Sequence, residues 1–234
     1  EGVCTFAIKG NKAVVFELNS ETDFVAKNEN FQALTDKIGQ ALIKSDVSNT
    51  EEALLVEVDG MTIENLIVES TAKIGEKITL RRVQSFTKTD TQTFGAYSHM
   101  QGKIVAFSIL EGANETVAKD VCMHVAAMSP KYLNEENIDP QDVEKEKEIL
   151  TQEALNEGKP ANIVEKMVLG RIQKYLKDIC LVHQPFVKNP DQTVGQYVKD
   201  NKGEVLHFIR LEVGEGIEKK DCDFAAEVAA AVNG

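Results

Sequence analysis

The chain has 234 residues, a formal net charge of −12 at pH 7 and a sequence pI near 4.9. This charge argues against a general nucleic-acid binder, because neutralising phosphates requires clustered Lys and Arg, so a protein partner is the better expectation. Hydrophobic residues make up 42% of the chain, enough for the cores of one large or two small domains, and no apolar run approaches the roughly 20 residues of a membrane span.

The first predicted unit opens with a β-hairpin over residues 3–8 and 13–18, which turns at Gly10-Asn11. A helix over residues 62–70 and a strand over residues 78–85 complete this unit. The strand contains the only adjacent pair of arginines, Arg81-Arg82. Because the segment alternates, we expect at least one of the two to lie on a solvated sheet face, and a phosphate-binding role is disfavoured.

The run Asn-Ser-Glu-Thr-Asp-Phe-Val-Ala-Lys follows the hairpin and places a carboxylate beside an aromatic ring at a strand-to-helix junction. Thr22 is expected to cap the helix, and Asp23 to lie in its first turn, where unpaired N–H groups favour a negative charge without any function. Phe24 precedes Phe31 and Ile38 at intervals of seven, so spacing alone favours a core position for Phe24. The alternative is a contact tip.

A second unit repeats the first. Strands are predicted over residues 94–100 and 104–110, and a helix begins near Asn114 after a polar linker at residues 88–93. Both helices open with Glu-Thr and soon reach Val-Ala-Lys, but only the first copy carries Asp-Phe between them. The last strand of the second unit is predicted only at residues 204–213, far beyond the helix, so an additional segment is inserted before it.

The insert, residues 134–181, predicts an antiparallel helical hairpin. Asp139-Pro140 is a helix start, and Gly158 with Pro160 ends one helix and begins the next. The two expected apolar stripes are Val143, Ile149, Leu150 and Leu155 in the first helix, and Ile163, Val164, Met167, Val168, Ile172 and Leu176 in the second.

The predicted fold class is α+β: two related subdomains of antiparallel sheet plus helices, an inserted helical hairpin and a C-terminal helix. The expected division is residues 1–91 for the N-terminal core subdomain, 92–133 and 182–216 for the C-terminal one, 134–181 for the hairpin, and 217–234 for an Ala-rich C-terminal helical module, helical over 221–232.

Motifs for covalent chemistry are absent from the sequence. There is no G-x-x-x-x-G-K-[S/T] loop and no G-x-S-x-G elbow, and His99, His124, His183 and His207 show no paired ligand spacing. His124 lies in an apolar helical pattern and is expected to be a core histidine. We therefore predict no enzyme, no cofactor and no metal site.

The four cysteines form no C-x-x-C pair, so neither a zinc site nor a disulfide framework is expected, which fits a reducing compartment. The N-terminal sequence does not resemble a signal peptide, although the given chain begins at Glu1 and not at Met. These cysteines are Cys4, Cys122, Cys180 and Cys222.

Several segments, in the right order, resemble the elongation factor Ts family, from about Gly10 to the last residue. They are Asn19–Lys27, Thr71–Glu76 followed by Arg81-Arg82-Val83, Met123–Ala127, Gly158-Lys159-Pro160 with Glu165-Lys166-Met167, Gln184–Val187, and Phe208–Arg210 through Val213–Lys219. The family's N-terminal helical module has no counterpart in this sequence.

The resemblance implies a guanine nucleotide exchange factor that binds the translational GTPase elongation factor Tu, GDP-bound and nucleotide-free, and promotes GDP release by disturbing its Mg²⁺ and phosphate site. It implies no direct contact with nucleic acid or membrane. The residues that it assigns to partner binding are Thr22, Asp23, Phe24, Val25, Ile74, Gly75 and His99. For Gly75 a helix C-cap is an equally good reading, and for His99 a surface position at a hairpin end.

In the longer family members the hairpin corresponds to a coiled-coil arm that contributes to self-association. The resemblance therefore leaves open whether this protein forms a homodimer. The resemblance implies a cytoplasmic protein, or one of an organellar matrix or stroma. The alternative function is a non-exchanging interaction or assembly subunit on the same scaffold.

Overall fold

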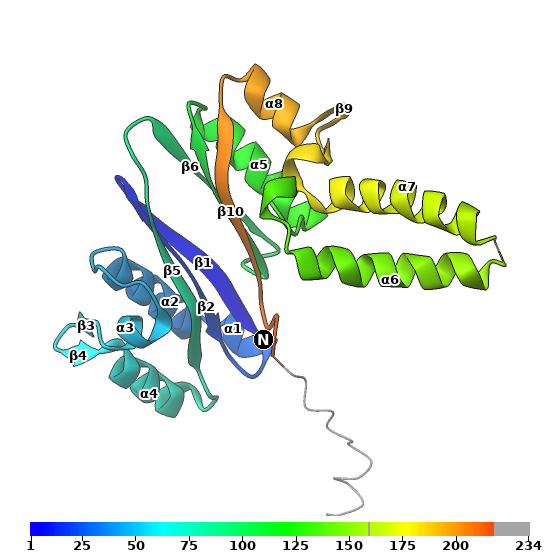
Figure 1. Ribbon diagram of the computed structural model, residues 1–234. Helices are drawn as coiled ribbons and strands as arrows, with labels where there is room; N and C mark the ends of the chain where they lie inside the picture. The colour runs from blue at the N-terminus through cyan, green and yellow to red at the C-terminus, as the bar shows by residue number, and fades with distance from the viewer. Residues whose placement is uncertain (159, 218–234) are drawn as a thin grey trace, which may run out of the picture.

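The computed structural model describes residues 1–158 and 160–217 (Figure 1). Within these residues the chain forms two three-stranded antiparallel sheets of the same topology, in which a late strand pairs beside the second strand of a hairpin. The sheets are β1-β2-β5, from β1 (Gly2–Lys9), β2 (Lys12–Asn19) and β5 (Thr79–Thr87), and β10-β7-β6, from β6 (Gln92–His99), β7 (Ile104–Glu111) and β10 (Glu204–Glu212). The predicted α+β class with two related units is confirmed.

Helices cover the outer face of the first sheet (Figure 1). Helix α2 buries Phe31, Leu34 and Ile38, whose spacing of three and four places them on one helical face. These side chains pack with Phe16 and Leu18 of β2 in one hydrophobic cluster. The elements of this layer are α1 (Asp23–Ala26), α2 (Glu29–Leu42), α3 (Thr50–Leu54), the ribbon β3 (Glu57–Val58) and β4 (Met61–Thr62), and α4 (Ile63–Ile74).

The second sheet has its own helical layer, in which α5 (Glu115–Met128) packs along β6 and β7. The contact is close at Gly95, where a Cβ atom would lie 2.4 Å from the carbonyl oxygen of Ala118, so only glycine fits there. Further parts of this layer are η2 (Leu181–His183), β8 (Pro185–Phe186), β9 (Asn189–Thr193) and α8 (Val194–Asp200).

The inner faces of the two sheets pack against each other, which gives the order helices, sheet, sheet, helices (Figure 1). Val15 of β2 and Phe107 of β7 lie in this inter-sheet core, while the alternate residues of β2 face the helices. The ring of Phe107 stacks on that of Phe86 with centroids 4.9 Å apart, and lies 5.2 Å from that of Phe94. Strand β2 is therefore buried on both faces.

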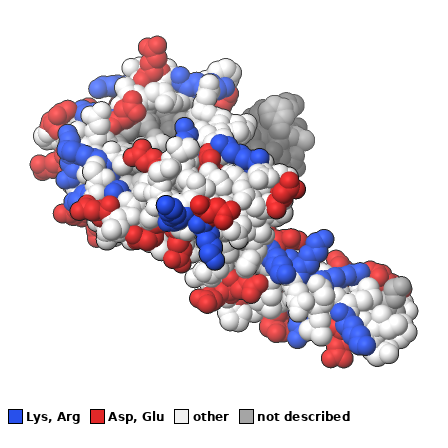
Figure 2. All heavy atoms as spheres, turned by 90° about the horizontal axis from the view of Figure 1, so that it is seen from above, with Lys and Arg blue, Asp and Glu red and all other residues white. Residues whose placement is uncertain are grey.

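A helical hairpin, α6 (Pro140–Asn156) and α7 (Ala161–Ile179), projects from the body after the short η1 (Glu135–Asn137), and acidic and basic side chains are interspersed over it (Figures 1 and 2). Ala154, Val164 and Val168 form its buried contact. The predicted stripes are wrong in part, because Ile149, Leu155 and Ile163 are exposed and the seam runs through Leu150 and Ala154. The small Ala154 lets the two helices approach.

One further difference concerns the start of β6. Gln92 and Thr93 belong to β6, so the connection between β5 and β6 is only residues 88–91. The predicted C-terminal helix over residues 221–232 lies outside the described residues, as does Cys222. Within the described part of the chain, no helix combines the length and the apolar character needed to cross a membrane.

Candidate functional site

The segment after β2, residues 20–27, forms a projecting tip. Thr22 caps α1 as predicted, because its side chain accepts a hydrogen bond from the N–H of Val25 (3.4 Å), and Asp23 lies in the first turn. The ring of Phe24 is 82% exposed, so the core position that the spacing favoured is wrong. Val25, in contrast, packs partly against the core of the first unit.

The chain breaks the helix between the tip and the core stripe, which explains the exposure of Phe24. Helix α1 ends at Ala26, and Asn28 caps α2 separately by accepting from the N–H of Asn30. Phe31 and Ile38 are fully buried on α2. The interval of seven therefore does not extend back to Phe24, because the three aromatic and aliphatic side chains do not share one helix.

Glu76 fastens the tip to the turn between α4 and β5. Its carboxylate accepts from the hydroxyl of Thr22 (2.6 Å), from the N–H of Thr22 (2.9 Å) and from the N–H of Glu21 (3.2 Å). These bonds lower the pKa of the Glu76 carboxyl, and the bond from the Thr22 hydroxyl has the largest effect. Glu76 is not among the residues predicted from the sequence for this site, although it directly follows Ile74 and Gly75.

Ile74 and Gly75 lie in this same turn, so Glu76 brings them to the tip. Gly75 has φ +85° and donates its N–H to the carbonyl of Thr71 (2.9 Å), which confirms the helix C-cap reading. No atom lies within 4 Å of a Cβ built on Gly75, so its surface is open. A partner contact there stays a prediction.

A groove of about 1030 Å³ separates the tip from the turn between β6 and β7. Asp23 and Lys27 line it on the tip side, Met100 and Gln101 on the other side, and β1 contributes residues 2–5. Cys4 of β1 donates its N–H to the carbonyl oxygen of Gly102 (2.7 Å), which holds the β6–β7 turn on the first sheet.

The β6–β7 turn has an unusual backbone. Met100, Gln101 and Gly102 have φ of +50°, +55° and +88°, and left-handed conformations cost energy for residues other than glycine. Met100 is 66% exposed. His99 precedes it at the end of β6 as an exposed side chain whose Nδ1 lies 3.2 Å from the hydroxyl of Tyr97; its neighbours line the groove, but His99 does not.

The charge of the tip is held by a local ion pair. Lys27 Nζ lies 2.7 Å from Asp23 Oδ2, and this hydrogen bond lowers the pKa of the Asp23 carboxyl. The side chain of Asp23 remains 44% exposed. The tip therefore presents an ionised carboxylate and an apolar ring together. Among residues 1–158 and 160–217, no group of three His, Cys, Asp or Glu side chains is placed to hold a metal ion.

The arginine pair does not lie on a solvated sheet face, and that prediction is wrong. Arg82 Nε donates to Glu17 Oε2 (2.7 Å) and Arg81 Nη1 to the same oxygen (3.3 Å), and the Glu17 side chain is fully buried. Both guanidinium groups are engaged with an internal carboxylate and with residues at and just after the end of β10. The signal missed was Glu17, the one charged residue in the apolar run of β2.

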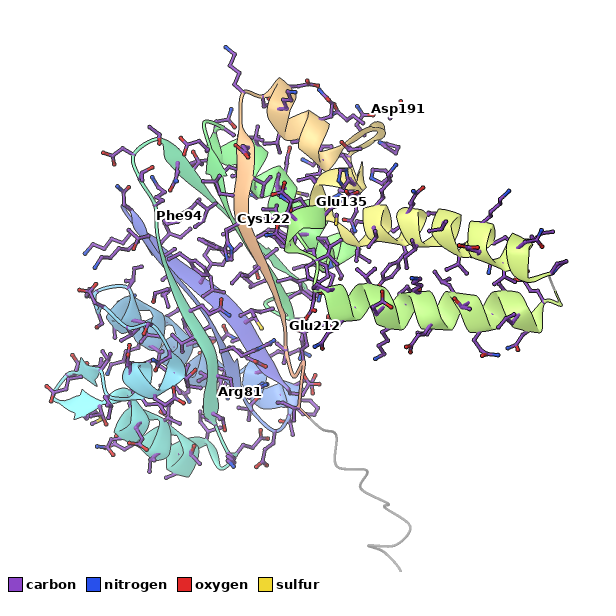
Figure 3. All side chains as sticks on the ribbon, in the orientation of Figure 1. Arg81, Phe94, Cys122, Glu135, Asp191 and Glu212 are labelled. Atoms are coloured by element: carbon purple, nitrogen blue, oxygen red, sulfur yellow. The ribbon has the colours of Figure 1, made fainter. Side chains whose placement is uncertain are left out.

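His124 is a core histidine, as predicted. It is fully buried on α5, its Nδ1 accepts from the N–H of Val187 (3.1 Å) and its Nε2 lies 2.8 Å from Gln184 Oε1. Burial lowers the pKa of the His124 imidazole. Cys122 on the same helix is also buried, and burial raises the pKa of its thiol to about 12 (Figure 3).

One comparison with known proteins bears on this geometry. The family model described as elongation factor TS matches residues 21–215, which is most of the chain. The match includes the tip, the turn at Ile74 and Gly75, His99, the hairpin and the last strand. The members of this family are guanine nucleotide exchange factors of elongation factor Tu in translation elongation and do not catalyse covalent chemistry. The chain belongs to the elongation factor Ts family.

Proposed function

We propose that this protein releases GDP from elongation factor Tu by placing Phe24 and Asp23 beside the Mg²⁺ and phosphate site of the GTPase. The observation that carries the proposal is the 82% exposure of Phe24 on a helix whose N-terminal cap, Thr22, is bonded to Glu76. A large ring exposed on a fixed support is suited to anchor an interface, because little ordering entropy is lost when it is buried.

The physical basis of exchange is linkage. A factor that binds the nucleotide-free GTPase more tightly than the GDP-bound one must weaken GDP binding by the same factor, about 1.4 kcal/mol for each tenfold. Both states of elongation factor Tu are therefore proposed as partners. The factor needs contacts that the GTPase offers fully only when its nucleotide site is empty, and an inserted ring can make such contacts.

The carboxylate of Asp23 supplies the second part of the proposal. A bound Mg²⁺ is the largest local charge beside the phosphates of GDP, so disturbing the polar groups that hold it weakens GDP more than an ordinary contact would. Asp23 is ionised, half-exposed and adjacent to Phe24. Lys27 keeps the carboxylate oriented without covering it.

The proposed contact surface extends over both sides of the groove. Ile74 and Gly75 join it because Glu76 ties their turn to Thr22, and His99 joins it at the end of β6. We propose the division into residues 1–91, 92–133 with 182–216, 134–181 and 217–234 as the domain organisation. The hairpin is proposed as a self-association arm.

The test is the release of a fluorescent GDP analogue from elongation factor Tu, followed in stopped flow against increasing concentration of this protein. We expect a saturable acceleration that excess free Mg²⁺ opposes. The alternative, an interaction subunit without exchange activity, predicts a complex that is detected by light scattering while the rate of GDP release stays at its intrinsic value. That outcome would overturn the proposed function.

A further inference from the structure

Glu17 is a carboxylate in a place where the sheet needs an apolar residue. It follows Ala13 and Val15 on the inter-sheet face of β2, and its side chain is 0% exposed. A buried charge is costly unless hydrogen bonds satisfy it, and packing alone would be served better by a hydrophobic side chain. Something other than packing therefore accounts for this carboxylate.

The bonds of Glu17 join parts of the chain that are far apart in sequence. Its Oε1 accepts from the N–H of Gly214 (2.7 Å) and from Asn19 Nδ2 (2.8 Å), and its Oε2 accepts from Arg82 and Arg81. Gly214 lies just after β10, the last strand of the second sheet. The carboxylate thus connects the middle strand of the first sheet to the end of the second.

The two arginines extend this connection along residues 212–215, which we call the exit segment. Arg82 Nη2 donates to the carbonyl of Glu212 (2.5 Å), and its Nη1 to Glu215 Oε2 (2.9 Å). Arg81 Nη2 donates to the carbonyl of Glu215 (3.2 Å). Figure 3 shows Arg81 and Glu212 at the same end of the molecule. Glu17 orients both guanidinium groups for these bonds.

The backbone at Arg82 is strained in the same place. Two residues of β5, Arg82 and Val83, stand opposite Phe16 of β2, which makes a bulge, and Arg82 has φ +51°. Such a conformation is kept only where the surroundings determine it. Here it aims the guanidinium of Arg82 at Glu17 and the exit segment together.

The exit segment also reaches the far side of the groove. Val213 donates its N–H to the carbonyl of Lys103 (2.9 Å), the residue that ends the β6–β7 turn and lines the groove. On the near side, β2 runs from Glu17 to Asn19, and the tip begins at Ser20. The chain of bonds from Glu17 through Gly214 and Val213 to Lys103 therefore connects the strand that leads to the tip with the residue at the end of the β6–β7 turn.

We propose that Glu17 is a positioning residue for nucleotide exchange, which holds the tip and the β6–β7 turn at a fixed separation by clasping the exit segment. The proposal rests on the proposed function of the tip. A surface whose two parts are already in place loses less entropy on binding than one that the partner must order. Glu17 touches neither nucleotide nor GTPase; it acts through the geometry that it fixes.

The test is Glu17→Gln, which keeps the volume but removes the charge and one acceptor oxygen. In the free protein, hydrogen exchange at the amides of Val213 and Gly214 should accelerate, because their segment is released. In the exchange assay, the concentration for half-maximal GDP release should rise about tenfold, an ordinary coupling factor, while the limiting rate at saturation stays unchanged because Phe24 is intact.

Asp120→Asn is the matched control. Like Glu17, Asp120 is a buried carboxylate paired with a cation, in this case Lys188, but it lies on α5 in the helical layer of the second unit. It should lower thermal stability without moving the half-maximal concentration. Glu215→Gln is the second test variant, since Glu215 is 56% exposed and its loss spares the fold. It should shift both readouts in the same direction by a smaller factor.

A folded Glu17→Gln protein with wild-type amide protection at Gly214, or with a wild-type half-maximal concentration, would overturn the proposal. If Glu17→Gln does not fold, wild-type values of both readouts in Glu215→Gln would overturn it equally. Failure of the proposed function is recognised separately: wild-type protein would not accelerate GDP release at all, whereas the amide protection of the exit segment is measured without any partner.

Discussion

The hydroxyl of Thr22 donates to Oε1 of Glu76 at 2.6 Å, while the N–H of Thr22 donates to Oε2 at 2.9 Å. One residue thus caps α1 and is itself held through two of its atoms by a carboxylate 54 positions later. A tip of only a few residues would be mobile if its own cap alone fixed it, because its ordering entropy would be unopposed. Glu76 makes the tip part of the first unit.

Phe24→Ala tests the ring as the wedge. We expect the limiting rate of GDP release to fall more than about tenfold, because an interface aromatic contributes roughly 2 kcal/mol or more. The free energy of unfolding should change by less than about 0.5 kcal/mol, since the ring is solvated in the free protein. Stopped-flow exchange and urea unfolding measure the two quantities.

The control for this prediction is Val68→Ala on α4, which removes an apolar side chain that is 62% exposed but lies outside the tip. It should change neither quantity. A Phe24→Ala protein that loses several kcal/mol of its own stability and keeps its exchange rate per folded molecule would show that Phe24 is structural.

Local signals in the sequence were sufficient for most elements. Caps such as Thr22, Asn114 and Asp139 act over three or four residues, so helix starts can be predicted from them, and the structure confirms each. The repeat of a hairpin followed by a helix is also visible in the sequence, and it predicts the two related sheets. The core position predicted for Phe24 is wrong because the helix is broken at Lys27 and Asn28, so Phe24 does not share the periodicity of α2.

The packing of the two sheets could not be predicted from local patterns, because it depends on contacts between residues far apart in the chain. One signal was present: residues 13–16 and 18 of β2 are apolar without alternation, which is typical of a strand buried on both faces. Glu17 interrupts that run. A charge in such a strand indicates a distant partner, but the sequence does not say that the partner is Gly214.

Glu76→Gln tests the fastening of the tip, and its pH dependence has a definite sign. The folded-state pKa of Glu76 is lowered from 4.5, so its contribution to stability is present above pH 4.5 and is lost as the pH falls through the folded-state value. The variant should therefore be less stable than wild type at pH 7, and the difference should shrink at acid pH. Thermal unfolding from pH 7 to pH 3 measures this.

The same variant should slow exchange at neutral pH, because Thr22 loses its carboxylate partner and Phe24 its fixed support. Glu52→Gln is the control, since Glu52 also has a lowered pKa but accepts from Ser48, away from the tip. Equal exchange rates in the Glu76 and Glu52 variants would contradict the assigned role of Glu76.

His124 predicts a loss of stability in mild acid. Burial lowers its folded-state pKa below 6.5, so the neutral imidazole stabilises the fold above pH 6.5, and this contribution is lost as the pH falls towards the folded-state pKa. His124→Gln should be less stable at pH 7.5 but show a flatter stability profile between pH 6.5 and pH 5. His183→Gln, a change on the surface, should keep the wild-type profile; if it flattens instead, the assignment to His124 is wrong.

Removing the hairpin should leave nucleotide release largely intact. The base of the hairpin closes through an isolated β-bridge between Tyr132 and Cys180, so residues 136–177 can be replaced by a short Gly-Ser linker without separating the ends. The hairpin has its own hydrophobic contact around Ala154, apart from both sheet cores. GDP release is measured beside light scattering, which should show a loss of self-association. Abolished exchange in a folded deletion would place the hairpin on the GTPase.

Asp23→Asn separates the charge of the tip from its shape. Asn and Asp serve almost equally at helix starts, and the ion pair with Lys27 is largely exposed, so the melting temperature should hardly change. Exchange should still fall, because the neutral amide perturbs the groups around Mg²⁺ less than a carboxylate does. Excess free Mg²⁺ should oppose the wild-type protein through linkage, and the variant should respond less steeply. The measurement is a Mg²⁺ titration of the GDP release rate with both proteins. Lys27→Gln is the control, because it removes the ion-pair partner of Asp23 but keeps the carboxylate, and it should retain the steep response. Superimposable Mg²⁺ curves for wild type and Asp23→Asn would exclude a charge-based role and leave Phe24 as the sole wedge.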